Sequence, residues 1–414
     1  MLREHARAIY EGAIRDNLPD IAVKNALKAL PEYTGRLILV AIGKAGYQMA
    51  KAAYMELGDK IDSGIVITKY DHVMGELGKI KCYEAGHPVP DKSTLLATRR
   101  ALSLTADLCE NDLVLFLVSG GGSALFENVD CSLEELQELT SALLASGASI
   151  NEVNLIRKRL SNVKAGRFAV HCLPARVFAV VLSDVLGNDL SVIASGPACA
   201  DHSTENDALN ILNKYKISPS KIVLELLMRK TPREIQNAQS IITGSVSELC
   251  KSAKRIAGDL GYKAEIVTDN IDCEATAFGK ELAKKASDYK DTSEPLAFIY
   301  GGETVVHLKG NGIGGRNQEI ALSASLHIRN IDNCIIFSVG SDGTDGPTDA
   351  AGGICDSKTY ERIAKSKKSA DEYLKSNDSY TALSHAGDLI FTGPTGTNVN
   401  DLAVVLIQPK KVNS

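Results

Sequence analysis

A lysine lies between two glycines directly after an apolar run near the start of this sequence. The run covers residues 37–42, and the loop that follows reads Gly43-Lys44-Ala45-Gly46. Backbone amides at the start of a helix attract anions, and a lysine side chain adds a full positive charge. We therefore predict that Gly43, Lys44 and Gly46 bind a phosphate or a carboxylate.

A second glycine-rich loop follows the apolar run at residues 113–118. It contains Ser119, Gly120, Gly121, Gly122 and Ser123. Consecutive glycines expose backbone N–H groups without side chains in the way, which is the geometry of an anion-binding nest. The pattern predicts an anion here and leaves its identity open.

Residues 151–167 form the third candidate segment. If they are helical, the apolar residues form one buried stripe, and Arg157, Ser161 and Lys164 lie together on another face. Such a face is more often simply solvated. It becomes a binding element only if Arg157 lies close to the loop of three glycines.

Two carboxylates follow the apolar run at residues 177–183. Asp184 and Asp189 belong to the segment Ser183-Asp184-Val185-Leu186-Gly187-Asn188-Asp189. Carboxylates in a turn at the end of a strand can hold Mg²⁺, or one of them can accept a proton from a substrate hydroxyl. Each taken singly is also compatible with ordinary turn capping.

Polar, glycine-rich loops recur in the second half of the sequence, at residues 310–319, 340–347 and 392–398. We predict that they form walls of a binding cleft, because a purely structural turn needs only one or two such residues. The candidates that they supply are Arg316, Asn317, Glu319, Asp342, Thr397 and Asn398.

Composition excludes several functional classes. The 414 residues include 46 Lys and Arg against 51 Asp and Glu, so a net charge of −5 gives no general attraction to nucleic acid or to an anionic membrane. The apolar runs are far shorter than the ~20 residues that span a bilayer. No secretory signal pattern begins the chain and the nine cysteines form no C-x-x-C pair, so we expect a cytoplasmic protein.

The order of apolar runs predicts an α/β protein of two domains. Short runs alternate with helix-like stretches over residues 1–233, which indicates a Rossmann-like, doubly wound parallel sheet. Residues 234–414 have fewer and shorter helices, which indicates a smaller mixed sheet. Its first strand is expected at residues 240–243, and a hairpin is expected around residues 301–303.

Two nucleotide-binding motifs can be tested. The Walker pattern is absent, because the Gly-Lys pairs at Lys44, Lys79 and Lys280 are followed by Ala, Ile and Glu. Residues 310–315 do fit G-x-G-x-x-G. A dinucleotide site there would need an acidic residue at the end of the next strand, whereas Asp332 precedes that strand.

These segments, taken in order, resemble the class II glycerate kinases, whose C-terminal half is called the MOFRL domain. The resemblance covers nearly the whole chain, and Ala165 stands where the family pattern has glycine. It rests on Gly43-Lys44-Ala45-Gly46, His87-Pro88-Val89-Pro90-Asp91, Ser119-Gly120-Gly121-Gly122-Ser123, Arg157-Lys158-Arg159-Leu160-Ser161, Ser183-Asp184-Val185, Ser195-Gly196-Pro197, Gly301-Gly302-Glu303-Thr304, Gly314-Gly315-Arg316-Asn317-Gln318-Glu319, Ser341-Asp342-Gly343-Thr344-Asp345-Gly346-Pro347 and Gly393-Pro394-Thr395-Gly396-Thr397-Asn398.

The resemblance implies a kinase that transfers the γ-phosphoryl group of ATP to D-glycerate, with Mg²⁺, in a cleft between the two domains. It implies 2-phosphoglycerate as the product, and Lys44 and Arg316 as active-site residues. From the chemistry of the loops, we expect Asp184 to act on the glycerate hydroxyl and Asp189 and Asp342 to be metal ligands. The sequence leaves open whether copies of the chain form a homo-oligomer.

Two other functions remain open at this stage. One is a hydroxypyruvate reductase that uses a nicotinamide cofactor. The G-x-G-x-x-G pattern at residues 310–315 would bind that cofactor. The other is a non-catalytic protein that binds a small hydroxy acid, in which Lys44 and the aspartates would be dispensable. Consumption of glycerate that depends on ATP distinguishes the kinase from both.

Overall fold

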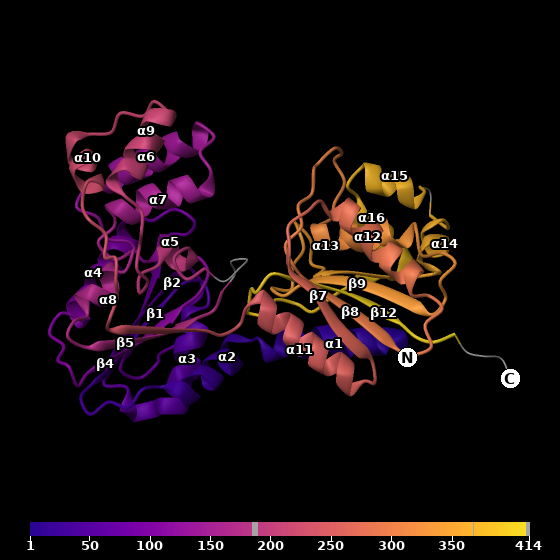
Figure 1. Ribbon diagram of the computed structural model, residues 1–414, viewed down its shortest axis with the longest axis horizontal. Coiled ribbons are helices and arrows are strands. Elements are labelled where there is room, and N and C mark those ends of the chain that lie inside the picture. Colours follow the sequence, from indigo (N-terminus) through magenta and orange to yellow (C-terminus); the bar gives the residue numbers. More distant parts are fainter. Residues whose placement is uncertain (184–188, 367, 411–414) are drawn as a thin grey trace. The chain divides into compact units, whose positions relative to one another are not determined.

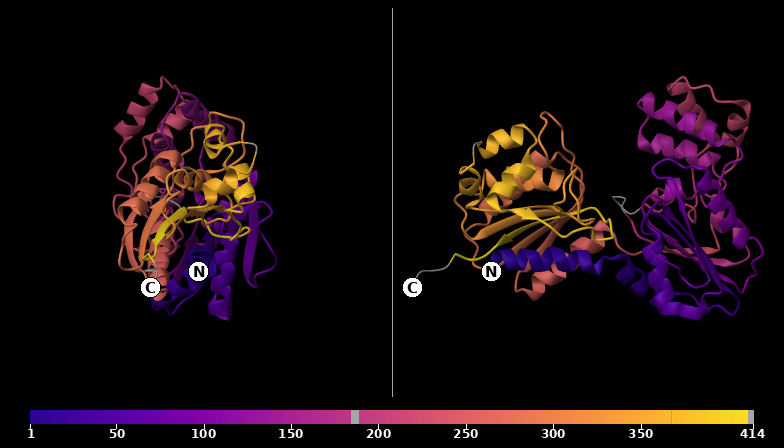
Figure 2. Two further views of the ribbon diagram at one scale, coloured as in Figure 1. Left: turned by 90° about the vertical axis from the view of Figure 1, so that its right-hand side faces the viewer. Right: turned by 180° about the vertical axis from the view of Figure 1, so that it is seen from behind.

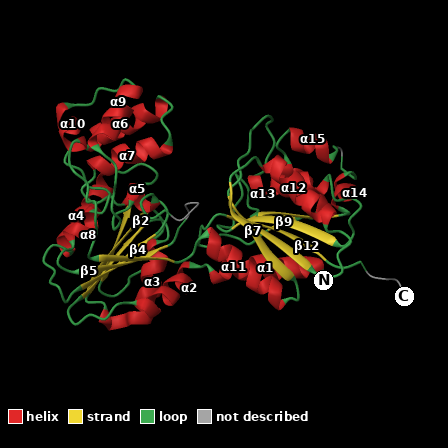
Figure 3. Cartoon of the chain, in the orientation of Figure 1, coloured by secondary structure: helices red, strands yellow, loops and turns green. Residues whose placement is uncertain are grey.

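The computed structural model describes residues 1–183, 189–366 and 368–410, and the chain divides into two compact units. We call residues 19–243 the parallel-sheet unit, and residues 1–18 together with 244–414 the mixed-sheet unit. Figure 1 shows their elements, and Figure 3 shows that each unit combines one sheet with helices. The expected α/β fold class, with one parallel and one mixed sheet, is confirmed.

The parallel-sheet unit is built on six strands in the order β3-β2-β1-β4-β5-β6, all parallel. This order is that of the dinucleotide-binding doubly wound folds, and it reverses direction between β1 and β4. The strands are β1 (Leu37–Ile42), β2 (Ser63–Lys69), β3 (Ile80–Ala85), β4 (Leu113–Val118), β5 (Arg176–Val181) and β6 (Ala238–Ile242).

Helices cover both faces of this sheet, which explains why β1 and β4 are apolar and buried along their whole length. Alternate strand residues such as Val40 and Phe116 pack with Phe168 on one face. Helices α4 (Lys92–Leu104) and α8 (Arg167–His171) lie on that face, whereas α3 (Gly46–Leu57) covers the other and packs with α2 (Pro19–Ala26). The short helix α5 (Gly122–Leu125) follows β4.

Four further helices of this unit form a cluster with a core of its own (Figure 1). They are α6 (Leu133–Ala145), α7 (Ile150–Leu160), α9 (Glu205–Lys214) and α10 (Lys221–Leu227). Leu143, Ile156 and Leu227 are among the side chains buried between them. Because α7 packs against α6, α9 and α10, its position is held on several sides.

The mixed-sheet unit contains six strands in the order β11-β10-β9-β12-β8-β7. Strand β12 pairs antiparallel with both neighbours, while β7 and β8 are parallel. The strands are β7 (Lys263–Ile271), β8 (Leu296–Gly302), β9 (Cys334–Gly340), β10 (Gly352–Asp356), β11 (Leu389–Ile390) and β12 (Asp401–Ile407).

The helices of the mixed-sheet unit lie on both faces of its sheet, as the two further views in Figure 2 show. Helix α1 (Leu2–Asp16) packs on one face beside α11 (Val246–Asp259), with the rings of Tyr10 and Phe337 5.6 Å apart. Helices α12 (Ala275–Asp288) and α13 (Arg316–Ser325) cover the other face. The remaining helices are α14 (Thr359–Ile363), α15 (Ala370–Lys375) and α16 (Ser379–Ala386).

The division differs in two places from the one expected after residue 233. The strand expected to begin the second domain is β6, which pairs with β5 as the edge strand of the parallel sheet, so that unit ends at residue 243. The first helix, assigned by its position to the N-terminal domain, packs with the mixed-sheet unit. An apolar pattern identifies a buried face and does not identify the sheet that buries it.

The hairpin expected around residues 301–303 is wrong. Strand β8 ends at Gly302, and residues 304–308 form no strand beyond an isolated bridge of Val305 with Glu274. The antiparallel neighbour of β8 is instead β12, from near the end of the described chain. None of the helices within the described residues is long and apolar enough to cross a membrane.

Candidate functional site

The two glycine-rich loops of the parallel-sheet unit meet at the carboxyl ends of β1 and β4. The amide of Lys44 donates to the carbonyl of Gly120 at 2.8 Å, and the amide of Ala45 donates to Oγ of Ser119 at 3.0 Å. Because the strand order reverses between β1 and β4, this is the switch point at which such sheets bind ligands. The sequence-predicted residues of both loops are therefore brought together.

Two of the glycines permit this close approach. Gly43 has φ of +107°, and a Cβ atom there would lie 2.3 Å from Oγ of Ser119. Gly121 has φ of +83°, and a Cβ atom there would lie 3.0 Å from ring atoms of His87 and 3.1 Å from Cγ of Lys44. Glycine is needed at both positions for backbone conformation and for space.

Open backbone donors accompany this packing. Over the described part of the chain, the amides of Gly120 and Gly121 donate no hydrogen bond, whereas the amide of Gly122 turns back to the carbonyl of Ser119 at 3.3 Å. The hydroxyls of Ser123 and Ser195 lie 2.9 Å apart beside them. The loop therefore offers backbone N–H groups to a ligand, as an anion nest requires.

Arg157 lies against the glycine-rich loop, as a binding role requires. It is on the last turn of α7, and its Nη2 donates to the carbonyl of Ser123 at 2.8 Å. The helix ends at Leu160, however, so Lys164 does not continue its face. Lys164 is instead fully buried, with Nζ 2.5 Å from the carboxylate of Glu127, and has a structural role.

Positive charge without a carboxylate partner collects at this edge of the sheet. Within the described residues, Lys44 and Arg157 form no ion pair, and neither does Lys69, the last residue of β2. Burial, Lys44 and Lys69 together lower the pKa of His87. Lys69 and His87 were not predicted as site residues, although each comes at or just after the end of a strand.

The acidic loop after β5 is only partly described. Asp184 lies outside the described residues. Asp189 is exposed, and its Oδ1 accepts the amide of Ser191 at 2.8 Å. This is the ordinary turn-capping contact considered for such residues.

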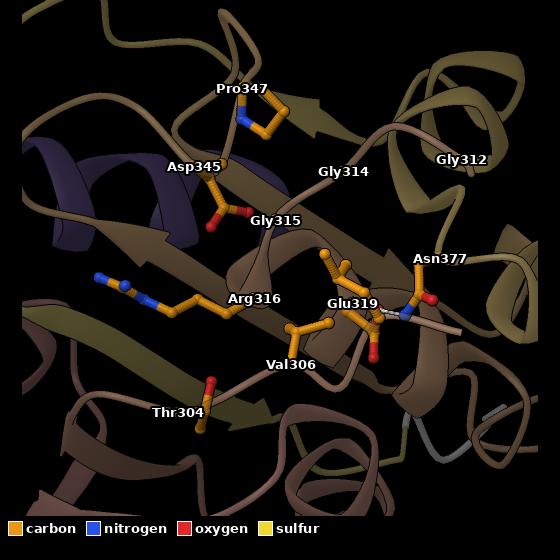
Figure 4. A pocket seen from close by; sticks show the side chains of 12 residues that line it. Thr304, Val306, Gly312, Gly314, Gly315, Arg316, Glu319, Asp345, Pro347 and Asn377 are labelled. Carbon is orange, nitrogen blue, oxygen red and sulfur yellow. Dashed lines mark hydrogen bonds between the residues drawn. The ribbon is translucent and has the colours of Figure 1, made fainter. Parts of the chain in front are cut away.

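Three candidates of the mixed-sheet unit, Arg316, Asn317 and Glu319, lie in the N-terminal part of α13, beside a pocket of about 390 Å³ (Figure 4). Arg316 is the first residue of this helix. Its Nε and Nη2 donate to the carboxylate of Asp401 at 2.5 and 3.0 Å, and its Nη1 donates to Glu303 at 2.6 Å. Burial alone would lower the pKa of Arg316, but Asp401 and Glu303 outweigh it and raise that pKa, so Arg316 stays charged.

A buried carboxylate caps the same helix. The two oxygens of Asp345 accept the amides of Asn317 at 3.1 Å and Gln318 at 2.8 Å. Burial raises the pKa of Asp345 to about 6, although these amides and Arg316 act against it. A Cβ atom at Gly315 would lie 2.3 Å from the carboxyl carbon of Asp345, so this approach depends on glycine.

Glu319 faces the pocket one turn further along α13. Its oxygens accept hydrogen bonds from Thr276 at 2.9 Å and Asn377 at 3.1 Å, the latter drawn in Figure 4. Burial raises the pKa of Glu319. Asn317 is fully buried, and its side chain contacts Ser338 and Asp345 rather than the pocket.

The last three candidates differ in accessibility. Thr397 is buried, and its hydroxyl donates to the carbonyl of Asn17 at 3.0 Å. Asn398 is exposed, and Oδ1 of Asp342 accepts the amide of Thr344 at 3.0 Å. Sequence analysis missed Asp401, which anchors Arg316. A carboxylate at the start of an otherwise apolar strand was the available signal.

The dinucleotide motif at residues 310–315 lacks the structural setting that it needs. A dinucleotide fingerprint joins a strand directly to a helix by a tight turn. Here β8 ends at Gly302, and an irregular segment separates it from the motif and from α13. The geometry therefore does not support a nicotinamide site at this position.

Comparisons with known proteins agree over the full length. The family model described as a domain of unknown function (DUF4147) matches residues 5–228, and that of the MOFRL family matches residues 296–401. D-glycerate 2-kinase of Thermotoga maritima is 53% identical over 98% of each chain, and glycerate 2-kinase of Pyrococcus horikoshii is 38% identical over 99% of this chain and 98% of the relative. The crystal structure of glycerate kinase from Thermotoga maritima superposes with a TM-score of 0.95, covering 98% of this chain and 99% of the other.

Proposed function

Because the chain belongs to the MOFRL family of glycerate kinases, we propose that it transfers the γ-phosphoryl group of ATP to the C2 hydroxyl of D-glycerate. The products would be 2-phosphoglycerate and ADP. The observation that carries this proposal is a group of three cations, Lys44, Lys69 and Arg157, which have no carboxylate partner among the described residues and lie at the sheet edge with the open backbone amides. Both substrates are anions, so a site for them needs positive charge that the protein has not already neutralised.

Phosphoryl transfer demands position and charge from a protein more than covalent chemistry. In this proposal, Lys44 and Arg316 neutralise the charge that builds on the γ-phosphoryl oxygens. They belong to different units, so catalysis would require that the substrates engage both. The loop from Ser119 to Ser123, with Arg157, would hold an anionic group of one substrate.

Carboxylates have two roles in this mechanism. Asp184 or Asp189 would orient the glycerate hydroxyl or hold Mg²⁺, and Asp342 is the matching candidate in the mixed-sheet unit. No group of three or more His, Cys, Asp or Glu residues that could hold a metal occurs in the parts of the chain that the structure describes. One or two carboxylates still fit Mg²⁺, because this ion usually completes its shell with water and substrate phosphates. When bound, the ion would neutralise phosphate charge.

The product of the reaction tests the proposal directly. The protein is incubated with ATP, Mg²⁺ and D-glycerate, and the phosphorylated product is examined by phosphorus NMR. A phosphate on C2 couples to one proton and gives a doublet, whereas a phosphate on C3 couples to two and gives a triplet. A triplet would contradict the proposed position, and the absence of a new phosphate ester would contradict the kinase.

A parallel assay addresses the reductase alternative. Hydroxypyruvate and a reduced nicotinamide cofactor are mixed with the same preparation, and the absorbance of the reduced cofactor is followed. The proposal expects no enzyme-dependent change. Oxidation of the cofactor at a rate comparable with ATP-dependent phosphorylation would favour the reductase.

A further inference from the structure

His87 is held at the same edge of the parallel sheet as Lys44. It follows β3 in a short loop that ends at Asp91, and Asp91 caps α4 by accepting the amide of Thr94 at 2.9 Å. The loop is thus anchored by a strand at one end and by a capped helix at the other. This arrangement places the imidazole reproducibly, which is what a group that acts on substrate needs.

The imidazole packs against the glycine-rich loop, and its nitrogen atoms have no hydrogen-bond partner among the described residues. Its Cδ2 and Nε2 atoms lie against Gly121, each 3.0 Å from where a Cβ atom would be, and Cγ of Lys44 lies 3.1 Å from the same point. The side chain is partly exposed, and within the described residues neither ring nitrogen forms a hydrogen bond. A packed histidine with both nitrogens free can still receive a hydrogen bond from a ligand.

Burial and the surrounding positive charges favour the neutral form of this imidazole. Burial, Lys44 and Lys69 all lower the pKa of His87. Two carboxylates of the adjoining described segments, Asp91 and Glu84, are engaged in other contacts. Asp91 accepts the hydroxyl of Tyr70 at 2.7 Å, and Glu84 accepts the amides of His72 and Val73 at 2.9 Å. A neutral imidazole among cations can accept a proton, whereas the ammonium groups beside it cannot.

We propose that His87 is a catalytic residue that accepts the proton of the glycerate hydroxyl during transfer. The inference rests on the proposed kinase function and names a proton acceptor other than the carboxylates. The hydroxyl oxygen forms a bond to the γ-phosphorus, the bond from that phosphorus to the β-γ bridging oxygen breaks, and ADP leaves with its electron pair. The hydroxyl proton passes to a ring nitrogen of His87 and then to solvent. General bases of this kind contribute about 10²- to 10⁴-fold to the rate.

The test compares His87→Gln and His72→Gln. His72 is a partly exposed histidine of a neighbouring loop whose ring contacts the carbonyl of Tyr70 at 3.1 Å, so it controls for the loss of a partly exposed imidazole. In the wild type, kcat should rise with pH through the pKa of His87 and then level off. His87→Gln should lower kcat by about 100-fold, abolish this acidic limb and leave KM for ATP within a few-fold. His72→Gln should keep the wild-type profile.

A second variant distinguishes a catalytic role of His87 from a structural one. In His87→Ala, with folding checked by circular dichroism, added imidazole should restore part of the rate, and more basic imidazoles should restore more. An acidic limb that survives in His87→Gln, or a His87→Ala enzyme that imidazoles do not rescue, would overturn the proposal. Absence of glycerate phosphorylation by the wild type would instead overturn the proposed function itself.

Discussion

The guanidinium group of Arg316 contacts both oxygens of the Asp401 carboxylate, at 2.5 Å through Nε and 3.0 Å through Nη2. A third N–H group donates to Glu303 at 2.6 Å. Because a guanidinium carries five N–H donors in a rigid plane, two have no acceptor among the described residues and can serve a ligand. The carboxylates thus fix the direction in which Arg316 offers its remaining donors.

Arg316→Lys should therefore lower kcat/KM for glycerate phosphorylation by about 100-fold, because a point charge cannot contact both oxygens of Asp401 and keep a fixed direction. Steady-state release of ADP measures the effect. Arg255→Lys is the matched control, since Arg255 also contacts two carboxylates, Asp16 and Asp259, on the surface of the same unit. Wild-type activity of Arg316→Lys would show that the planar geometry is irrelevant.

Lys44→Ala should lower kcat by about 10³-fold or more while the protein stays folded. The reason is that an oriented charge in a site shielded from water contributes several kcal/mol to the transition state. Stopped assays of 2-phosphoglycerate and circular dichroism measure rate and fold. Lys51→Ala, an exposed lysine on α3, serves as the control. If Lys44→Ala stays within a few-fold of the control, the proposed role of Lys44 is wrong.

The parallel sheet was predictable because its buried strands carry the clearest sequence signal. The runs at 37–42 and 113–118 are the bounds of β1 and β4, since strands covered on both faces are apolar throughout. That the loops at Lys44 and Gly121 come together was not predicted and follows from the sheet order, in which β1 and β4 are neighbours. The hydrogen bond from Lys44 to Gly120 follows from that neighbouring position.

Long-range partners were not predictable in this way. Strand β6 lies at a sheet edge and is only partly buried, and its assignment to either sheet depended on pairing that no local pattern records. The missed residues of the site have the same cause. Asp401 contacts Arg316, 85 residues earlier, and His87 lies beside Lys44 because β3 and β1 end at the same edge.

Gly121→Ala should impair catalysis beyond its cost in stability. A methyl group would press on His87 and Lys44, at 3.0 and 3.1 Å, and φ of +83° strains any residue with a side chain. Gly147→Ala isolates the strain, because Gly147 has φ of +79° with nothing within 4 Å of its Cβ position. Both variants should lose about 1–2 kcal/mol in the free energy of unfolding.

Only Gly121→Ala should also lower kcat/KM, by about 10-fold or more, because a small misplacement of the reacting groups is costly. Urea unfolding and steady-state kinetics on the two variants give both quantities. Equal activity of the two alanine variants would mean that the contact of Gly121 with His87 and Lys44 has no catalytic importance.

The buried ion pair of Lys164 and Glu127 should be a large determinant of stability. Both side chains are 0% exposed, and Nζ lies 2.5 Å from the carboxylate. Lys164→Met leaves a buried carboxylate without its partner, so the free energy of unfolding should fall by about 3–5 kcal/mol. Replacing both residues by apolar ones should cost less than this single change.

The control is Lys284→Met, which removes the exposed ion pair with Asp288. It should change the free energy of unfolding by about 1 kcal/mol or less. A loss in Lys164→Met as small as that in Lys284→Met would contradict this view.

Asp345 should make the protein more stable as the solution is acidified from pH 7 towards pH 4. Burial raises its pKa to about 6 in the folded state. In the unfolded chain an aspartate has a pKa of about 3.9, so between these values the folded state binds the extra proton. The free energy of unfolding contributed by Asp345 should therefore rise by about 2 kcal/mol between pH 7 and pH 4. Asp345→Asn cannot bind this proton. Urea unfolding of the wild type and of Asp345→Asn at several pH values therefore isolates the contribution of Asp345 to the free energy of unfolding. Asp371→Asn, at an exposed aspartate, is the control. A difference between wild type and Asp345→Asn that stays flat would mean that Arg316 and the helix amides keep Asp345 ionised throughout.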